Sequence, residues 1–120
     1  MKSKARAVVI GGGVVGVSTL YHLAAKGWDD SILLERKSLT SGSTWHAAGL
    51  LPLFNMSYSV GQIHKYSVRF YQELQDETGM DVGFRKVSNI RLASTQDRMD
   101  EYLQYKGVAD NIGVEVKVLS

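Results

Sequence analysis

Three glycines near the start of the chain have the spacing best suited to chemistry: Gly11, Gly13 and Gly16 form the pattern G-x-G-x-x-G. A diphosphate binds against bare backbone at the start of a helix, where unpaired amides and the helix dipole favour negative charge. In such a turn, the first glycine permits the sharp exit from a strand and the second lets the backbone approach the pyrophosphate. The third lets the helix pack closely on the strand. The spacing predicts a dinucleotide-binding turn, with a purely structural turn as the alternative.

Glu35 is the next residue with a predicted role, nineteen positions after Gly16 and directly after a second apolar run. A carboxylate at that place accepts hydrogen bonds from the hydroxyls of an adenosine ribose. It would repel a 2′-phosphate, so the residue favours FAD or NAD over a phosphorylated dinucleotide. The spacing alone does not separate FAD from NAD.

These residues need a strand, a helix and a second strand to position them. Residues 7–10 are a short apolar run, which predicts a buried parallel strand. Helical spacing then runs from Val14 until Gly27, which supplies a stop, and residues 31–34 form a second strand. The predicted fold class is α/β, a Rossmann-like βαβ unit whose parallel sheet is incomplete in this chain. We therefore expect the chain to be a fragment of a larger protein or one piece completed by another chain.

Further along, the pattern predicts two helices and two strands. A helix is expected after Ser57, with a core stripe of Ile63, Tyr66, Phe70 and Leu74, and Gly79 is expected to end it. The remaining elements are a strand at 89–93, a helix opened by a capping box of Ser94 and Asp97 and running through Tyr105, and a last strand over 114–118.

Small hydroxylated residues occupy the loop after Glu35, which reads LTSGSTWHAAGL from Leu39 to Leu50. Their hydroxyls are suited to donate to phosphate and ribityl oxygens at a second helix start. Enzymes that use NAD seldom need such a loop, so it favours FAD.

At this loop the sequence resembles the flavin-dependent amine oxidoreductases that include dimethylglycine dehydrogenase, sarcosine dehydrogenase and dimethylglycine oxidase. The resemblance covers nearly the whole chain and is most specific from Gly42 to Leu50, with further similarity at Gly79, 90–93 and 98–101. It implies FAD as the cofactor, an N-methylated amino acid as the substrate and hydride transfer to the flavin. It also implies that residues 1–80 are the N-terminal part of an FAD-binding domain and that 81–120 start a substrate-binding domain.

The resemblance also implies roles for single residues. His46 matches the histidine that is covalently joined to the 8α-methyl of the flavin; without the resemblance, it would be expected to be a packed core residue. The resemblance further implies that Gly11, Gly13 and Gly16 bind the pyrophosphate and that Glu35 binds the ribose. It places Ser43 and Thr44 at the phosphates, Arg36 near the adenine, and Gly49 and Leu50 at the edge of the isoalloxazine. Trp45 either covers the flavin or fills the core beside it. The catalytic base is not identified, and Arg91 is expected to be an exposed strand arginine rather than an anion partner.

Composition removes several other classes of function. The chain has no cysteine and a net charge of +2 with dispersed basic residues, so we expect no disulfide, no metal site and no nucleic-acid partner. His22 and His64 lack acidic or sulfur neighbours at metal-ligand spacing. The sequence also predicts no targeting segment and no membrane helix, which favours a bacterial cytoplasm, with a processed mitochondrial matrix protein as the alternative.

Two rival functions remain open. One is a non-catalytic, flavin-binding regulatory protein, since the regulatory subunit of pyruvate dehydrogenase phosphatase resembles the same family. The other is an NAD-dependent dehydrogenase. For the favoured function, the expected partners are a small methylated amine and, through other domains, a folate or an electron acceptor.

Overall fold

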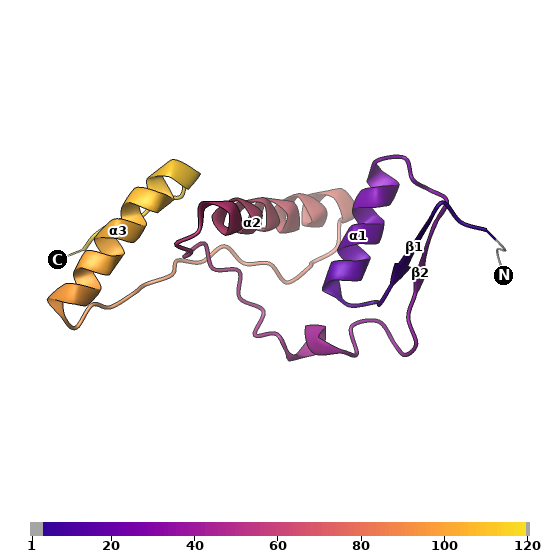
Figure 1. Ribbon diagram of the computed structural model, residues 1–120, viewed down its shortest axis with the longest axis horizontal. Helices are drawn as coiled ribbons and strands as arrows, with labels where there is room; N and C mark the ends of the chain where they lie inside the picture. The colour runs from indigo at the N-terminus through magenta and orange to yellow at the C-terminus, as the bar shows by residue number, and fades with distance from the viewer. Residues whose placement is uncertain (1–3, 120) are drawn as a thin grey trace. The chain divides into compact units, whose positions relative to one another are not determined.

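The computed structural model describes residues 4–119 and contains the elements β1, α1, β2, η1, α2 and α3, in that order (Figure 1). The chain forms two compact units that divide between Leu50 and Leu51. The first unit holds both strands and α1, and the second unit holds the two longer helices.

The first unit is a parallel βαβ structure. Strand β1 (Ala7–Ile10) pairs with β2 (Ser31–Leu34) in register, so that Ala7 faces Ser31 and Ile10 faces Leu34. Helix α1 (Val14–Ala25) connects the two strands. The predicted strands, helix and parallel pairing are confirmed, and so is the fold class.

Helix α1 ends where the sequence predicted it to end. Gly27 adopts a left-handed φ of 78°, and the amide of Trp28 donates to the carbonyl of Leu23. This conformation is favourable for glycine because it has no Cβ, and it satisfies carbonyls that the last helical turn leaves unpaired. Gly27 therefore turns the chain back toward β2.

Within residues 4–119 the sheet consists of β1 and β2, and α1 packs against it. Three of its apolar side chains are exposed: Val8 at 53%, Ile10 at 85% and Leu34 at 54%. Parallel sheets are normally covered on both faces. The exposure agrees with the prediction that the sheet is incomplete in this chain.

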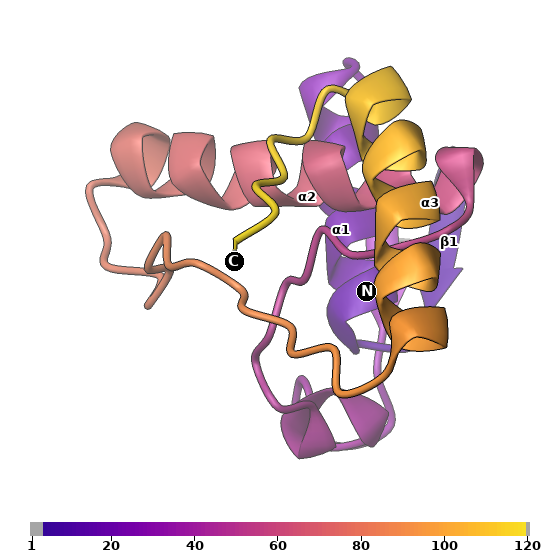
Figure 2. The ribbon, with the colours of Figure 1, turned by 90° about the vertical axis from the view of Figure 1, so that its left-hand side faces the viewer.

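The second unit is built from α2 (Tyr58–Thr78) and α3 (Gln96–Ile112), and Figure 2 shows α3 crossing α2 near the N-terminal end of α2. At the crossing, a Cβ built on the buried Gly61 would lie 2.3 Å from Cδ1 of Ile112, so any side chain at position 61 would force Ile112 to shift. Lys65 Nζ donates to the carbonyl of Ile112 at 2.9 Å. The buried hydrophobic residues of the described chain lie on α3: Tyr105, Ala109 and Ile112.

The prediction of a buried stripe on α2 was wrong for its first two residues, Ile63 and Tyr66. Ile63 is 63% exposed and Tyr66 is 45% exposed, while Phe70 and Leu74 are half-buried. The stripe has the helical period, but α3 covers α2 through Gly61 and Lys65 instead. The predicted end of α2 is confirmed, because Gly79 follows it with a φ of 65°.

The strands predicted at 89–93 and 114–118 were wrong, since both segments are irregular in the described residues. A strand exists only when a neighbour pairs with its backbone, and neither segment finds one here. The capping prediction for α3 was displaced by one residue: Thr95, not Ser94, accepts from the amide of Arg98 at 3.3 Å. The helix also extends past Tyr105 to Ile112, where Gly113 ends it with a φ of 77°.

Candidate functional site

The glycine turn joins β1 to α1 with very little space between backbone segments. Gly11 has a φ of 105°, and its amide continues the strand pairing by donating to the carbonyl of Leu34 at 2.8 Å. A Cβ built on Gly16 would lie 1.9 Å from the carbonyl oxygen of Gly11 and 3.4 Å from Cγ1 of Val9. Gly16 therefore cannot carry a side chain without moving the turn, as its predicted steric role requires.

The start of α1 presents backbone amides. Its N-cap, Gly13, has no side chain to satisfy them, and within the described residues Gly13, Val15 and Gly16 have no acceptor for their amides. The amide of Val14 donates to Oγ1 of Thr44 at 2.9 Å. Unpaired amides at a helix N-terminus favour an anion because of their orientation and the helix dipole.

Glu35 directly follows β2, and its side chain contacts the glycine turn. One carboxylate oxygen, Oε2, accepts from the amide of Gly12 at 2.7 Å, and Oε1 accepts from the amide of Lys37 at 2.8 Å. These two hydrogen bonds, first that from Gly12, lower the pKa of Glu35 below its ordinary value. Glu35 is therefore an anion at neutral pH, and each oxygen keeps a lone pair for another donor.

Gly12 is a site residue that the motif did not single out. It is buried, and a Cβ there would lie 2.6 Å from Cδ2 of Leu39 and 3.1 Å from Cβ of Glu35. Its carbonyl accepts from the amide of Thr40, which itself has a left-handed φ of 63°. The signal that could have found it is the unbroken run of three glycines at 11–13.

The hydroxylated loop forms a short 3₁₀ helix, η1 (Ser43–His46). Thr44 reaches the start of α1, whereas His46 is exposed and its Nδ1 lies 3.2 Å from the carbonyl oxygen of Gly42. The rings of Trp45 and His46 lie 4.0 Å apart at 38°, and Trp45 is 66% exposed. Trp45 therefore does not fill a core among the described residues.

The structure brings together one part of the predicted site. The glycine turn, Glu35 and Thr44 lie in direct contact, as the distances above show. Five predicted residues make no hydrogen bond to this group within residues 4–119 and are exposed: Arg36, Ser43, His46, Gly49 and Leu50. Gly49 has a φ of 69°, and Leu50 is 77% exposed.

In the described part of the chain, no three or more His, Asp or Glu side chains lie close enough together to hold a metal ion. His22 Nδ1 lies 2.7 Å from the carbonyl oxygen of Ser18, one turn earlier in α1. Among the same residues, no helix has both the length and the apolar character needed to cross a membrane.

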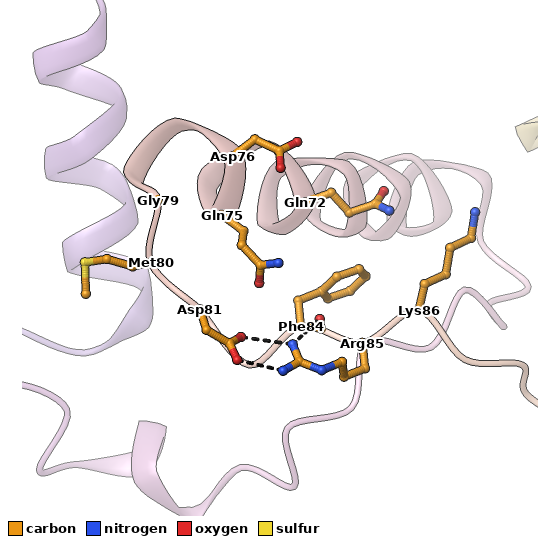
Figure 3. Close-up of a pocket in the computed structure, with 9 residues that line it drawn as sticks. All are labelled: Gln72, Gln75, Asp76, Gly79, Met80, Asp81, Phe84, Arg85 and Lys86. Atoms are coloured by element: carbon orange, nitrogen blue, oxygen red, sulfur yellow. Dashed lines mark hydrogen bonds and ion pairs between the residues drawn. The ribbon is translucent and has the colours of Figure 1, made fainter.

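The second unit contains a hollow of about 700 Å³ beside the end of α2 (Figure 3). Asp81 and Arg85 close one side with two hydrogen bonds of 2.9 and 2.6 Å, which lower the pKa of Asp81 to about 2. Gln75 points into the hollow, and its buried Oε1 has no partner among the described residues. None of the residues predicted to bind flavin lines this hollow.

Comparison with known proteins shows which family this chain resembles. Residues 6–120 match the model of the FAD dependent oxidoreductase family, DAO. The chain is 50% identical over 84% of its length to the mitochondrial dimethylglycine dehydrogenase of Rattus norvegicus. It is 42% identical over 96% of its length to the 4-methylaminobutanoate oxidase (formaldehyde-forming) of Paenarthrobacter nicotinovorans, and 42% identical over its full length to the mitochondrial sarcosine dehydrogenase of Homo sapiens.

A weaker match, 34% identical over the full chain, is the mitochondrial regulatory subunit of pyruvate dehydrogenase phosphatase from Mus musculus. The chain spans 12 to 14% of the length of these relatives. The family match covers both compact units, and the glycine turn, the unpaired amides of α1 and Glu35 are the features that such a cofactor requires. This chain therefore belongs to the FAD-dependent oxidoreductase family.

Proposed function

We propose that this chain forms part of the FAD site of an enzyme that oxidises an N-methylated amino acid. The main support for this proposal is the geometry at the start of α1. There the amides of Gly13, Val15 and Gly16 have no partners, and Gly16 has no room for a side chain. This cradle fits a diphosphate, because it combines unpaired donors with a close backbone approach. When bound, FAD supplies an acceptor for hydride from the C–H bond next to the substrate nitrogen.

In this proposal Glu35 binds the adenosine ribose. Its two hydrogen bonds with Gly12 and Lys37 hold the carboxylate in one orientation and keep it ionised. Each carboxylate oxygen still has a lone pair to accept from a ribose hydroxyl. The same residue links the ribose subsite to the glycine turn, so the two subsites are positioned together.

We further propose that His46 is the point of covalent attachment to the flavin, through Nε2. A carbonyl oxygen only accepts hydrogen bonds, so the contact of Nδ1 with Gly42 requires the proton on Nδ1. The remaining nitrogen, Nε2, then carries the lone pair that a bond to the 8α-methyl needs. Because His46 is exposed, this nitrogen is accessible.

The attachment is tested by acid precipitation of the flavin-loaded protein. Flavin should stay with the pellet for the wild type and move to the supernatant for His46→Ala. His22→Gln is the matched control, since His22 contacts the carbonyl of Ser18 within α1 and has no predicted cofactor role. Equal release of flavin from wild type and His46→Ala would reject the covalent bond.

The remaining positions follow the family resemblance. We propose that Ser43 contributes to the phosphate site beside Thr44, that Arg36 lies near the adenine, and that Gly49 and Leu50 border the isoalloxazine. The exposure of Leu50 fits a surface that a flat apolar ring covers. We also retain the division into an FAD-binding part, 1–80, and a substrate-binding part, 81–120, as a proposal.

The rival is a non-catalytic flavin-binding regulator, which the weaker similarity to the phosphatase regulatory subunit keeps open. The enzyme proposal has more support, because the named dehydrogenases and the oxidase are 42 to 50% identical to this chain. Anaerobic addition of dimethylglycine or sarcosine should bleach the flavin absorbance if the protein is an enzyme. A flavin that binds but is never reduced by either amine would favour the regulator, and a colourless protein that binds NAD would contradict both.

Partners and location are proposals of the same kind. The proposed substrate class is a small methylated amino acid. The names of the relatives include dimethylglycine, sarcosine and 4-methylaminobutanoate. A folate or an electron acceptor as a further partner stays a prediction. The relatives include proteins named as mitochondrial as well as the Paenarthrobacter nicotinovorans oxidase, so the matrix and a bacterial cytoplasm are the two proposed locations, which fractionation separates.

A further inference from the structure

Arg91 differs from the other arginines of the second unit. Three of them are paired with a carboxylate close in sequence: Arg69 with Glu73, Arg85 with Asp81, and Arg98 with Glu101. Arg91 is exposed, and within residues 51–119 no acceptor lies within hydrogen-bond distance of its guanidinium. Its partner is instead the ring of Phe54, whose centroid lies 3.9 Å from Cζ of Arg91.

Phe54 is held by two tyrosines of α3. Its ring lies 4.2 Å from that of Tyr105 and 6.0 Å from that of Tyr102, centroid to centroid. Tyr105 is 5% exposed, and its hydroxyl donates to the carbonyl of Leu53 at 2.8 Å. This hydrogen bond attaches the backbone next to Phe54 to α3, so α3 supports the aromatic surface beneath Arg91.

The backbone that carries Arg91 is also attached to α3. The hydroxyl of Tyr102 donates to the carbonyl of Leu92 at 3.4 Å, directly after Arg91 in the chain. Burial raises the pKa of Tyr105, and the nearby positive charge of Arg91 offsets part of that rise. Both ends of the Arg91 side chain are thus constrained, one by Tyr102 and the other by Phe54.

A guanidinium stacked on an aromatic ring uses its face and leaves its five N–H groups free in the plane. Two of these groups match the two oxygens of a carboxylate in a bidentate pair. Holding the plane in advance reduces the side-chain entropy that binding would otherwise cost. A fixed, unpaired guanidinium of this kind is suited to recognise a planar anion.

We propose that Arg91, oriented by Phe54, binds the carboxylate of the amino-acid substrate. This inference rests on the proposed function, which requires a substrate with a carboxylate as well as a methylated amine. It corrects the expectation that Arg91 is an ordinary exposed arginine on a strand, since the segment is irregular and the guanidinium is stacked.

The test is a binding measurement on the flavin-loaded protein, and it does not need turnover. The probe is 3-methylbutanoate, in which a CH group replaces the amine nitrogen of dimethylglycine. Binding is followed by isothermal titration calorimetry. Trimethylamine, which lacks the carboxylate, is the second probe.

Arg91→Gln should raise the dissociation constant of 3-methylbutanoate roughly 10- to 100-fold, because a charge-assisted bidentate contact is lost. Affinity for trimethylamine should not change. Arg91→Lys should recover only part of the loss, since an ammonium offers no planar fork. Arg98→Gln is the matched control and should bind both probes as the wild type does, because that arginine is paired with Glu101.

An unchanged dissociation constant for 3-methylbutanoate in Arg91→Gln would overturn the proposal. A lower melting temperature of Arg91→Gln with unchanged affinity would also overturn it. That result would mean that Arg91 stabilises the protein by pairing with one of its own carboxylates. If Arg91→Gln does not fold, Phe54→Leu keeps the charge and removes the ring, and it should weaken binding several-fold. Binding that depends on Arg91 in a protein whose flavin no methylated amine reduces would reject the proposed function and leave the carboxylate site standing.

Discussion

The hydroxyl oxygen of Thr44 lies 2.9 Å from the backbone nitrogen of Val14, thirty residues earlier in the chain. This hydrogen bond attaches the loop after β2 to the first turn of α1. It satisfies one amide of a helix that has no capping side chain of its own. The loop after β2 and the glycine turn are therefore joined by a direct hydrogen bond.

Replacing Thr44 tests this attachment. Thr44→Val keeps the shape but removes the acceptor, and we expect a loss of about 1 kcal/mol in the free energy of unfolding, as for other lost N-terminal caps. We also expect the FAD dissociation constant to rise about five- to tenfold, because the loop loses its attachment to the cradle. The constant is measured in a His46→Ala background, where flavin exchange is reversible. Thr44→Ser retains the hydroxyl and should behave as the parent; equal loss in both variants would contradict the role of the hydroxyl.

Gly16→Ala should abolish flavin binding. The added Cβ would lie 1.9 Å from the carbonyl oxygen of Gly11, so the turn must move away from the helix. Flavin content per protein, read from absorbance, measures the effect. Gly107→Ala is the control, because that helical glycine has open space around its Cβ position and alanine favours a helix by up to about 1 kcal/mol. A Gly16→Ala protein with full flavin content would show that the close approach is not needed.

Glu35 predicts a stability that depends on pH. Its pKa in the folded protein is lowered, chiefly by the hydrogen bond from Gly12, so its stabilising effect is present above the ordinary pKa of 4.5. The effect is lost as the pH falls through the lower pKa of the folded state. Denaturant unfolding of wild type and Glu35→Gln should therefore differ at pH 7 by a constant amount that shrinks below about pH 4. A difference that grows as the pH falls would refute this assignment.

The crossing of α2 and α3 provides a double-mutant test. Gly61→Ala should destabilise the protein by about 1–3 kcal/mol, the usual cost of overpacking, because the new Cβ would lie 2.3 Å from Cδ1 of Ile112. Ile112→Val removes that atom, and the next nearest, Cγ1, is 3.3 Å away. Thermal unfolding of the double variant should recover most of the loss. Additive losses would mean that the two residues are not in contact.

Much of the first unit was predictable from local patterns. Two apolar runs, an intervening helical period and glycines at 11, 13, 16 and 27 indicate a βαβ unit, because each feature constrains its own neighbours in sequence. Glu35 was predicted by its distance from the turn. Its contact with Gly12 was not, because a hydrogen bond across 23 residues depends on the pairing of β1 with β2.

The second unit was less predictable for the same reason. The ends of α2 and α3 at Gly79 and Gly113 are local features, and the first was foreseen. The apolar stripe of α2 did not reveal that the contact with α3 runs through Gly61, because a glycine adds no hydrophobic signal. The strands expected at 89–93 and 114–118 have strand-like composition, but a strand also needs a partner, and composition does not report one.

By itself, the sequence predicted the kind of cofactor, since glycines at set intervals suit the steric demands of a diphosphate. It also determined the family, through the segment from Gly42 to Leu50. Only the tertiary structure decided that Thr44 supplies the cap of α1, that Gly12 anchors Glu35, and that Arg91 lies unpaired on Phe54. These relationships join residues 23 to 37 positions apart, and the packing of whole elements, not the local pattern, brings them into contact.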